Sequence, residues 1–296
     1  MEKSRLVLGT AQFGMDYGIN NKRGKIPKKE AFKILQEAID SGIDSIDTAS
    51  AYGESEAILG DFIKEFTGEI KIVSKLLPDC GHRQVNEAVK SSLGKLNVHT
   101  LYSCLIHSFE DYKKDRRIWE ELEKLKSDGK IKKIGFSLYF PLELESVLGD
   151  NLKIDMIQVP FSIFDQRFSP YLSELKKRKV EIYTRSVFLQ GLVFKKPDGL
   201  DNYFERIRDK IRRLNLLSKE LEVPISALCI NFVLFNEFID RVVVGVDTLE
   251  NLREIICAVN YSAKVKSIIH RLSGLREDNE KIILPFNWDF VKANAR

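Results

Sequence analysis

Eight short apolar segments of strand length recur along this 296-residue chain, separated by stretches with helical periodicity. In those stretches apolar residues recur every three to four positions, as in Ala31-Ile34-Leu35-Ala38-Ile39, which predicts amphipathic helices. Strict alternation of strands and helices predicts a parallel sheet. The predicted strands are residues 6–8, 43–46, 70–73, 101–106, 131–136, 156–159, 180–183 and 241–244.

Eight such units allow the sheet to close into a (β/α)8 barrel, the TIM-barrel fold, which we predict for this chain. The alternative is an open, doubly wound sheet, whose usual sign is a G-x-G-x-x-G motif after the first strand. Here the glycines of the segment Gly9-Thr10-Ala11-Gln12-Phe13-Gly14 lie too far apart for that motif. Barrels commonly exceed about 200 residues as one unit, so we expect residues 1–296 to form a single α/β domain.

Two longer segments interrupt the repeat of strands and helices. Residues 190–203, rich in Gly, Pro and Lys, follow the seventh strand, and a C-terminal extension occupies residues 260–296. Active sites of barrels are built at the C-terminal ends of the strands, and long loops in compact domains are often functional. We therefore expect both segments to cover a pocket at that end of the barrel.

The composition is typical of a soluble globular protein, with 47 Lys and Arg against 43 Asp and Glu and no long basic tract. It gives no indication of nucleic-acid binding. No apolar stretch approaches the roughly 18 residues of a membrane span, and no secretory signal follows Met1. Four scattered cysteines without a C-x-x-C pair indicate reduced thiols and no metal site. We expect a cytoplasmic protein that is a monomer or a weak homo-oligomer. The cysteines are Cys80, Cys104, Cys229 and Cys257.

Three consecutive predicted strands end in an ionisable residue, namely Asp47, Lys75 and His107. Burying an unpaired charge costs several kcal/mol, so these side chains should meet one another or water. The C-terminal ends of neighbouring parallel strands lie about 5 Å apart, which brings the three to one side of the barrel mouth. Tyr52 follows in the turn after Asp47, and Gly53 gives the flexible backbone that this turn needs before a helix.

These four side chains can deliver a proton. A phenol with a pKa of about 10 is a poor proton donor near neutrality. An adjacent ammonium favours phenolate, so we expect Lys75 to lower the pKa of Tyr52, with Asp47 holding Lys75 charged. His107 can donate a hydrogen bond to a carbonyl oxygen on which negative charge develops. The assembly therefore suits the reduction of a carbonyl compound.

The pattern Asp47-Thr48-Ala49-x-x-Tyr52-Gly53, with Lys75 and His107 at later strand ends, resembles that of the aldo-keto reductase superfamily over nearly the whole chain. The resemblance implies that Asp47, Tyr52, Lys75 and His107 are a catalytic tetrad that reduces a small aldehyde or ketone, with Tyr52 as the general acid. It also implies a nicotinamide cofactor, bound extended across the barrel mouth and covered by residues 190–203. The stretch 185–192 resembles bacterial members associated with sugar metabolism, so a sugar or sugar derivative is a candidate substrate.

By the same resemblance, the cofactor-binding residues lie at the ends of several strands. Ser137 and Gln158 would hold the nicotinamide carboxamide. Arg185 replaces the aromatic residue that family members stack on the nicotinamide, and its planar guanidinium can still stack. Leu138 stands where the family usually has Asn, which removes an amide able to bind the cofactor. The full set is Gly9, Thr10, Ser137, Gln158, Arg185, Ser186, Leu189, Gly191, Gly245, Asp247 and Asn251.

Asp247 occupies a position where the family usually has a basic or hydroxyl residue. A carboxylate there would repel a 2′-phosphate and could accept hydrogen bonds from ribose hydroxyls, unless Arg253 compensates. The family as a whole favours NADPH, which we expect as the cofactor, with NADH as the alternative because of Asp247.

Two other functions are open on the sequence alone. The barrel could hold a nicotinamide nucleotide without turnover, with Leu138, Arg185 and Asp247 marking the loss of catalysis. A desolvated Lys75 could instead form a Schiff base in a lyase, although Asp47 beside it would oppose this by raising the lysine pKa. In every case we expect the substrate loops to include residues 190–203 and the early side chains Phe13, Met15 and Tyr17.

Overall fold

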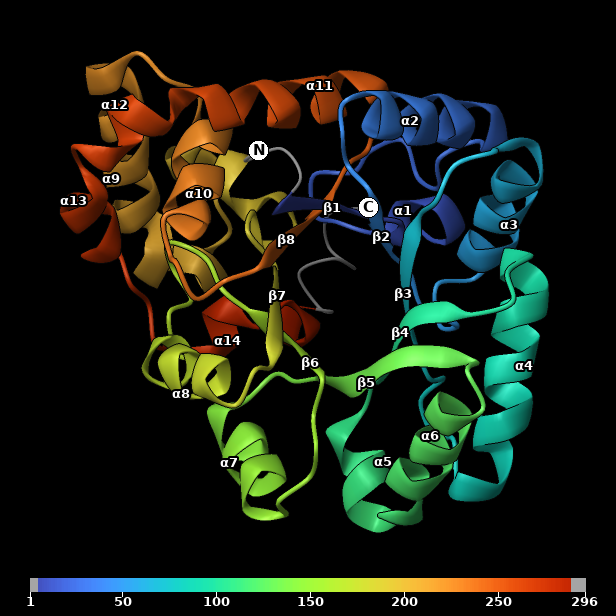
Figure 1. Cartoon of the computed structure of the whole chain (residues 1–296). Helices are drawn as coiled ribbons and strands as arrows, with labels where there is room; N and C mark the ends of the chain where they lie inside the picture. The colour runs from blue at the N-terminus through green and yellow to red at the C-terminus, as the bar shows by residue number, and fades with distance from the viewer. Residues whose placement is uncertain (1–4, 289–296) are drawn as a thin grey trace.

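The computed structural model describes residues 5–288 and shows a closed barrel of eight parallel strands in the order β1 to β8 (Figure 1). The last strand pairs with the first, with Gly245 opposite Gly9, so the sheet has no open edge. The predicted barrel is confirmed, and the open doubly wound sheet is excluded. The strands are β1 Leu6–Gly9, β2 Ser45–Asp47, β3 Lys71–Lys75, β4 Leu101–Ile106, β5 Ile131–Ser137, β6 Met156–Pro160, β7 Glu181–Arg185 and β8 Arg241–Gly245.

Helices surround the barrel (Figure 1). In α2 the predicted face is the buried one, since Ala31, Ile34, Leu35 and Ala38 all point into the core. The helices are α1 Ala11–Gly14, α2 Lys28–Asp40, α3 Ser55–Glu65, α4 Val85–Leu96, α5 Phe109–Lys114, α6 Arg117–Ser127, α7 Pro141–Gly149, α8 Leu172–Lys177, α9 Glu205–Leu221, α10 Ile225–Leu234, α11 Leu249–Ala258, α12 Ser262–Lys266, α13 Ile269–Ser273 and α14 Glu280–Ile283.

The barrel interior is packed with side chains and is not a pore. Val7, Val73, Leu105, Met156 and Tyr183, from five different strands, form a separate buried cluster there. Layers of bulky side chains are the usual filling of an eight-stranded barrel. Because the interior is closed, the mouth at the C-terminal strand ends is where polar side chains can reach a ligand.

The two interrupting segments fold into short elements. Residues 190–203 lie mostly in three turns of 3₁₀ helix, Leu189–Phe194, Pro197–Gly199 and Asn202–Phe204. In the C-terminal extension, α12, α13 and α14 are followed by a 3₁₀ turn in which Trp288 packs edge-on against Phe204 at 5.0 Å between ring centroids. The remainder of the predicted extension lies outside the described residues.

The four cysteines are free thiols, three of them buried and Cys257 exposed. Within residues 5–288, no helix has both the length and the apolar character required to cross a bilayer.

Substitution of Gly135 tests how tightly β5 and β6 are packed. A Cβ at this position would lie 1.7 Å from the backbone oxygen of Met156. We expect Gly135→Ala to lower the free energy of unfolding by about 1–3 kcal/mol, measured by urea denaturation, because main-chain atoms must move. The control is Gly94→Ala in α4, where a Cβ meets nothing within 4 Å and should raise stability by about 0.5–1 kcal/mol. Equal urea midpoints for Gly135→Ala and the wild type would contradict the close contact.

Candidate active site

A buried ion pair lies at the mouth of the barrel, at the adjacent ends of β2 and β3. Lys75 Nζ donates hydrogen bonds to Asp47 Oδ1 at 2.7 Å and to the backbone oxygen of Thr48 at 2.9 Å. Both side chains are almost completely buried, with 1% of Lys75 and 4% of Asp47 exposed. Breaking such a pair leaves an uncompensated buried charge, so each side chain holds the other in place.

Gln158 on β6 joins this pair from across the barrel mouth. Its Nε2 donates to the second carboxylate oxygen of Asp47 at 2.6 Å. Because the amide nitrogen faces the carboxylate, Oε1 faces away from it, and this buried oxygen accepts no hydrogen bond from any described residue. An unpaired buried carbonyl is unfavourable, so Oε1 is positioned to accept a hydrogen bond from a ligand.

Tyr52 and His107 complete the group. Lys75 Nζ lies 5.2 Å from the centroid of the Tyr52 ring, within the range of a cation–π contact. The His107 ring meets the Tyr52 ring edge-on, with centroids 6.1 Å apart. The four predicted side chains therefore come together, although no hydrogen bond between the Tyr52 hydroxyl and Lys75 is present in the described part of the chain.

The expected lowering of the Tyr52 pKa is wrong for this structure. Burial raises the pKa of Tyr52, and the carboxylate of Asp47 and the neighbouring Tyr139 raise it further. Arg185 is the cation that acts in the opposite direction. The physical reason is that the charge of Lys75 is balanced by Asp47, so the phenol faces a neutral pair in a poorly solvated place. Tyr52 consequently keeps its proton.

His107 directly follows β4 and is neutral. Burial lowers the pKa of His107 to about 3, and the charges of Lys75 and Arg185 act in the same direction. A neutral imidazole has one donor and one acceptor nitrogen. Its Nδ1 is buried and makes no hydrogen bond to any described residue, so the ring has hydrogen-bonding capacity left for a ligand.

Two glycines fix the backbone of the Tyr52 turn. A Cβ on Gly14, at the end of α1, would lie 1.7 Å from the backbone oxygen of Tyr52. Gly53 has φ +54°, and a Cβ there would lie 2.4 Å from the backbone oxygen of Gly14. The two main chains are therefore in direct contact, and the position of the phenol depends on α1. The sequence identified the role of Gly53 but missed that of Gly14.

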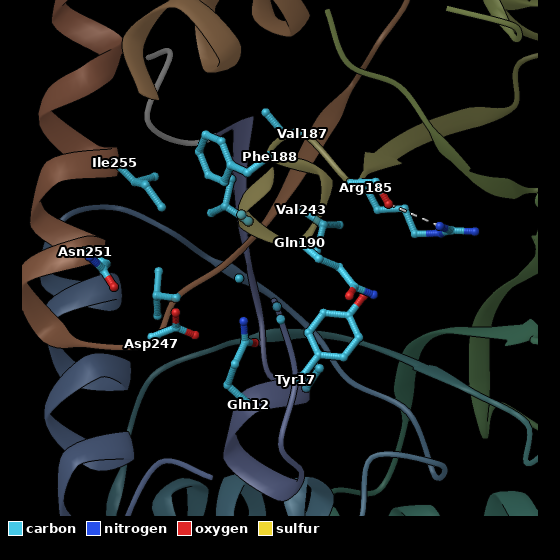
Figure 2. A pocket seen from close by; sticks show the side chains of 18 of the residues that line it. Gln12, Tyr17, Arg185, Val187, Phe188, Gln190, Val243, Asp247, Asn251 and Ile255 are labelled. Atoms are coloured by element: carbon cyan, nitrogen blue, oxygen red, sulfur yellow. Dashed lines mark hydrogen bonds between the residues drawn. The ribbon is translucent and has the colours of Figure 1, made fainter. Parts of the chain in front are cut away.

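A cavity of 470 Å³ opens beside this group, lined by the C-terminal ends of β1, β2, β6, β7 and β8 (Figure 2). Of the predicted residues, Lys75, His107, Ser137 and Leu189 do not line it. The predicted residues that do line it are Asp47, Tyr52, Gly9, Thr10, Gln158, Arg185, Ser186, Gly191, Gly245, Asp247 and Asn251.

Arg185 is the cation at the cavity wall nearest the phenol. Its Nη2 donates to the backbone oxygen of Leu138 at 3.0 Å and its Nη1 to Ser186 Oγ at 3.3 Å (Figure 2). The guanidinium carbon lies 4.0 Å from the centroid of the Tyr139 ring. The guanidinium of Arg185, which we predicted to stack on the nicotinamide, thus already has one face packed on the ring of Tyr139.

Residues 190–203 reach the cavity, because Gln190, Gly191 and Phe194 line it. Their segment is tied to the loop after β1: Asn20 Nδ2 donates to the Gly191 backbone oxygen at 2.7 Å. Backbone strain accompanies this contact at Gln190, which has φ +51°, whereas Gly191 adopts its φ of +91° without strain. Tyr17 from the same early loop also lines the cavity beside Gln190 (Figure 2). The sequence did not reveal this link between the two loops.

Other expectations about the loops are wrong. Phe13 is completely buried in the hydrophobic core and not in a substrate loop, because α1 turns its ring inward. Met15 is exposed and does not line the cavity. Residues 260–288 of the C-terminal extension also contribute nothing to the lining. They pack outside it, where the ring of Phe286 lies 5.1 Å from that of Tyr139.

Comparison with known proteins gives consistent results. A model of the Aldo/keto reductase family matches residues 5–275. The chain is 28% identical over 259 residues to the uncharacterized oxidoreductase YqkF of Bacillus subtilis (strain 168), covering 79% of this chain and 83% of that protein. It is 37% identical over 137 residues to glyoxal reductase of the same organism, covering 45% of this chain and 49% of that protein.

Solved structures show the same fold. The aldo-keto reductase AKR11C1 from Bacillus halodurans (holo form) superimposes with a TM-score of 0.74 at 21% identity, covering 94% of this chain and 95% of that chain. The glycerol dehydrogenase AKR11B4 from Gluconobacter oxydans gives a TM-score of 0.71 at 20% identity, covering 95% and 92%.

A double-mutant cycle tests the ion pair. We expect Asp47→Asn to lower the free energy of unfolding by about 3–5 kcal/mol, because it leaves the ammonium of Lys75 buried without a counter-ion. Adding Lys75→Met removes that charge, so the double variant should be more stable than Asp47→Asn alone. Urea denaturation at pH 7 gives the free energies of unfolding of the wild type, Asp47→Asn, Lys75→Met and the double variant. Additive effects of the two substitutions would show that the side chains are not coupled.

The stability of the protein in acid tests the state of His107. Its pKa is lowered from 6.5 to about 3 on folding, so the unfolded chain binds an extra proton between these values. The contribution of neutral His107 to the free energy of unfolding is therefore fully present above pH 6.5 and is lost as the pH falls towards 3. We expect His107→Gln to lose less stability than the wild type between pH 7 and pH 4, by on the order of 2–3 kcal/mol, in urea denaturation at both pH values. Parallel losses in the two proteins would mean that His107 is not neutral and buried.

Proposed function

The chain belongs to the aldo/keto reductase family, and on that premise we propose that it reduces an aldehyde or ketone to an alcohol, with a nicotinamide cofactor as hydride donor and Tyr52 as proton donor. One observation carries the proposal. The ion pair of Asp47 and Lys75 lies beneath the ring of Tyr52, a residue that lines the cavity, and His107 meets the same ring edge-on. Each of these side chains has a step to perform.

The cavity lining fits a nicotinamide cofactor. When bound, such a cofactor supplies the hydride. The unpaired Oε1 of Gln158 can accept a hydrogen bond from the amide group of a carboxamide. At Gly245, any Cβ would meet the side-chain amide of Gln12 at 2.8 Å, so the glycine keeps this part of the cavity wide enough for a ligand to lie against the main chain.

His107 and Tyr52 would act on the substrate carbonyl. The neutral imidazole of His107 donates a hydrogen bond to the carbonyl oxygen and so holds it beside the phenol. Tyr52, which keeps its proton because burial raises its pKa, donates to the same oxygen as negative charge develops there. The proton then moves from the phenol to the alkoxide and gives the alcohol.

Lys75 would act on the phenolate that this transfer leaves behind. A new negative charge on Tyr52 forms close to the ammonium, whose nitrogen lies 5.2 Å from the ring centroid. In a buried site this attraction is little screened, so it favours the transfer. Asp47 keeps the ammonium charged and Gln158 keeps Asp47 in place. Lys75 thus stabilises the product of proton transfer, and the pKa of the resting phenol is set by burial.

The structure speaks against a Schiff-base lyase. Lys75 is 1% exposed and donates two hydrogen bonds, one of them to the carboxylate of Asp47. A carbonyl carbon would have to displace Asp47 to reach its nitrogen.

For the substrate, aromatic and polar groups of Tyr17, Phe188, Gln190 and Phe194 surround the mouth, which fits small polar carbonyl compounds such as sugar-derived aldehydes. The similarity to a protein named glyoxal reductase also supports a small carbonyl compound as the substrate.

Removal of one oxygen atom tests the role of Tyr52. We expect Tyr52→Phe to lower kcat by roughly 10²–10⁴-fold, the usual contribution of a general acid, while the cofactor Kd changes by less than about twofold. Turnover is followed by cofactor absorbance with a panel of aldehydes and sugars. The matched control is Tyr171→Phe, which removes a hydroxyl bonded to Glu145 at the surface and should leave kcat unchanged.

Two results would decide against this role. Turnover in Tyr52→Phe equal to that of the wild type would exclude the phenol as proton donor. Cofactor binding by the wild type without turnover over the whole panel would favour the non-catalytic nucleotide-binding protein.

A further inference from the structure

The cavity has two chemically different ends. Tyr52, Asp47 and Gln158, where the proposed hydride transfer takes place, line the cavity together with Arg185, whose charge acts on Tyr52. Residues of α11 line it as well. Figure 2 shows Arg185 on one side of the cavity and Asp247, Asn251 and Ile255 on the opposite side. If the reacting ring of a dinucleotide lies beside Tyr52, its adenosine half must extend towards α11. The inference about α11 therefore rests on the proposed function, in which a nicotinamide dinucleotide binds in this cavity.

The end beside α11 is lined by carboxylates. Asp247 follows β8 and Glu254 lies one turn into α11, and both side chains line the cavity. Ser226 Oγ donates to Glu254 Oε1 at 2.6 Å, which fixes the second carboxylate in place. Among the described lining residues, Arg185 is the only Lys or Arg, and it lies at the opposite end.

Neighbouring arginines are occupied elsewhere. Arg253 donates from Nε and Nη2 to Glu37 Oε2 on α2, at 3.0 and 2.7 Å, and does not line the cavity. Arg23 is close enough to oppose the burial that raises the pKa of Asp247, but its two terminal nitrogens are bonded to the carboxylate of Glu30. Neither arginine lines the cavity, and each already has a carboxylate partner.

The first turn of α11 offers little compensation. A helix N-terminus attracts anions through its free backbone N–H groups. Here Thr248 Oγ1 already accepts a hydrogen bond from the Asn251 N–H at 3.1 Å, so this backbone donor is occupied. A 2′-phosphate would therefore meet two carboxylates and no Lys or Arg among the described residues that line this end, whereas a 2′-hydroxyl can donate a hydrogen bond to a carboxylate.

We propose that Asp247 and Glu254 select a cofactor whose adenosine ribose has a free 2′-hydroxyl, so that the protein prefers NADH to NADPH. This reverses the preference expected from the family as a whole. The reversal has a structural cause, because Arg253, the residue able to compensate for Asp247, is bonded to Glu37 instead.

Binding in the absence of a carbonyl substrate tests the proposal. NADH and NADPH are titrated separately into the wild-type protein, and the Kd values are obtained from the quenching of intrinsic fluorescence. We expect NADH to bind at least about tenfold more tightly at low salt. The ratio should decrease as salt is added, because the repulsion of the phosphate is screened.

Variants identify the residues responsible. Asp247→Asn and Glu254→Gln should each tighten NADPH binding by about three- to tenfold, and their combination by more. The matched control is Glu250→Gln, which removes the same charge from an exposed position of α11 that does not line the cavity. It should leave the ratio of Kd values within about twofold of the wild type.

The outcomes separate the two proposals. Equal or tighter binding of NADPH by the wild type would overturn the preference for NADH and leave the reductase proposal standing. Variants at Asp247 and Glu254 that behave like Glu250→Gln would overturn the assignment to these carboxylates. Failure of both dinucleotides to bind would overturn the proposed function together with this inference.

Discussion

The ion pair of Asp47 and Lys75 is the interaction on which the rest of the site depends. Two charges taken out of water are stable only if each meets good partners, because the desolvation of each ion costs several kcal/mol. Lys75 has Asp47 and the Thr48 backbone, and Asp47 has Lys75 and Gln158. These bonds connect β2, β3 and β6, so the same contacts that satisfy the charges also hold the barrel mouth in one shape.

Burial controls the protonation states around this pair. It keeps the proton on Tyr52 and keeps His107 neutral, in both cases because an ion in this place would be poorly solvated. The phenol and the imidazole therefore each keep a hydrogen that they can donate. Asp247 lies on the opposite side of the cavity from Arg185 (Figure 2), so the lining carries opposite charge on its two sides.

Topology explains what the sequence could predict. Alternating strands and helices determine which strand ends are neighbours, so the strand pattern alone was enough to place Asp47, Lys75 and His107 together. The directions of side chains beyond the strands are not determined in this way. The bond from Gln158 to Asp47, the pairing of Arg253 with Glu37 and the inward turn of Phe13 depend on packing between distant segments. The sequence led to the wrong pKa shift for Tyr52 for a related reason, because the balance between burial and a nearby charge depends on three-dimensional positions.

The contact between Gly14 and the turn of Gly53 has a consequence for how this protein can diverge. Neither glycine can gain a side chain by itself, since the obstructing atoms belong to the peptide backbone and no rotamer change removes them. Mutational drift at the mouth is therefore unequal. Substitutions that reshape the cavity lining while the phenol stays in place are therefore expected in the loops around Tyr17 and Gln190 and not at these two glycines.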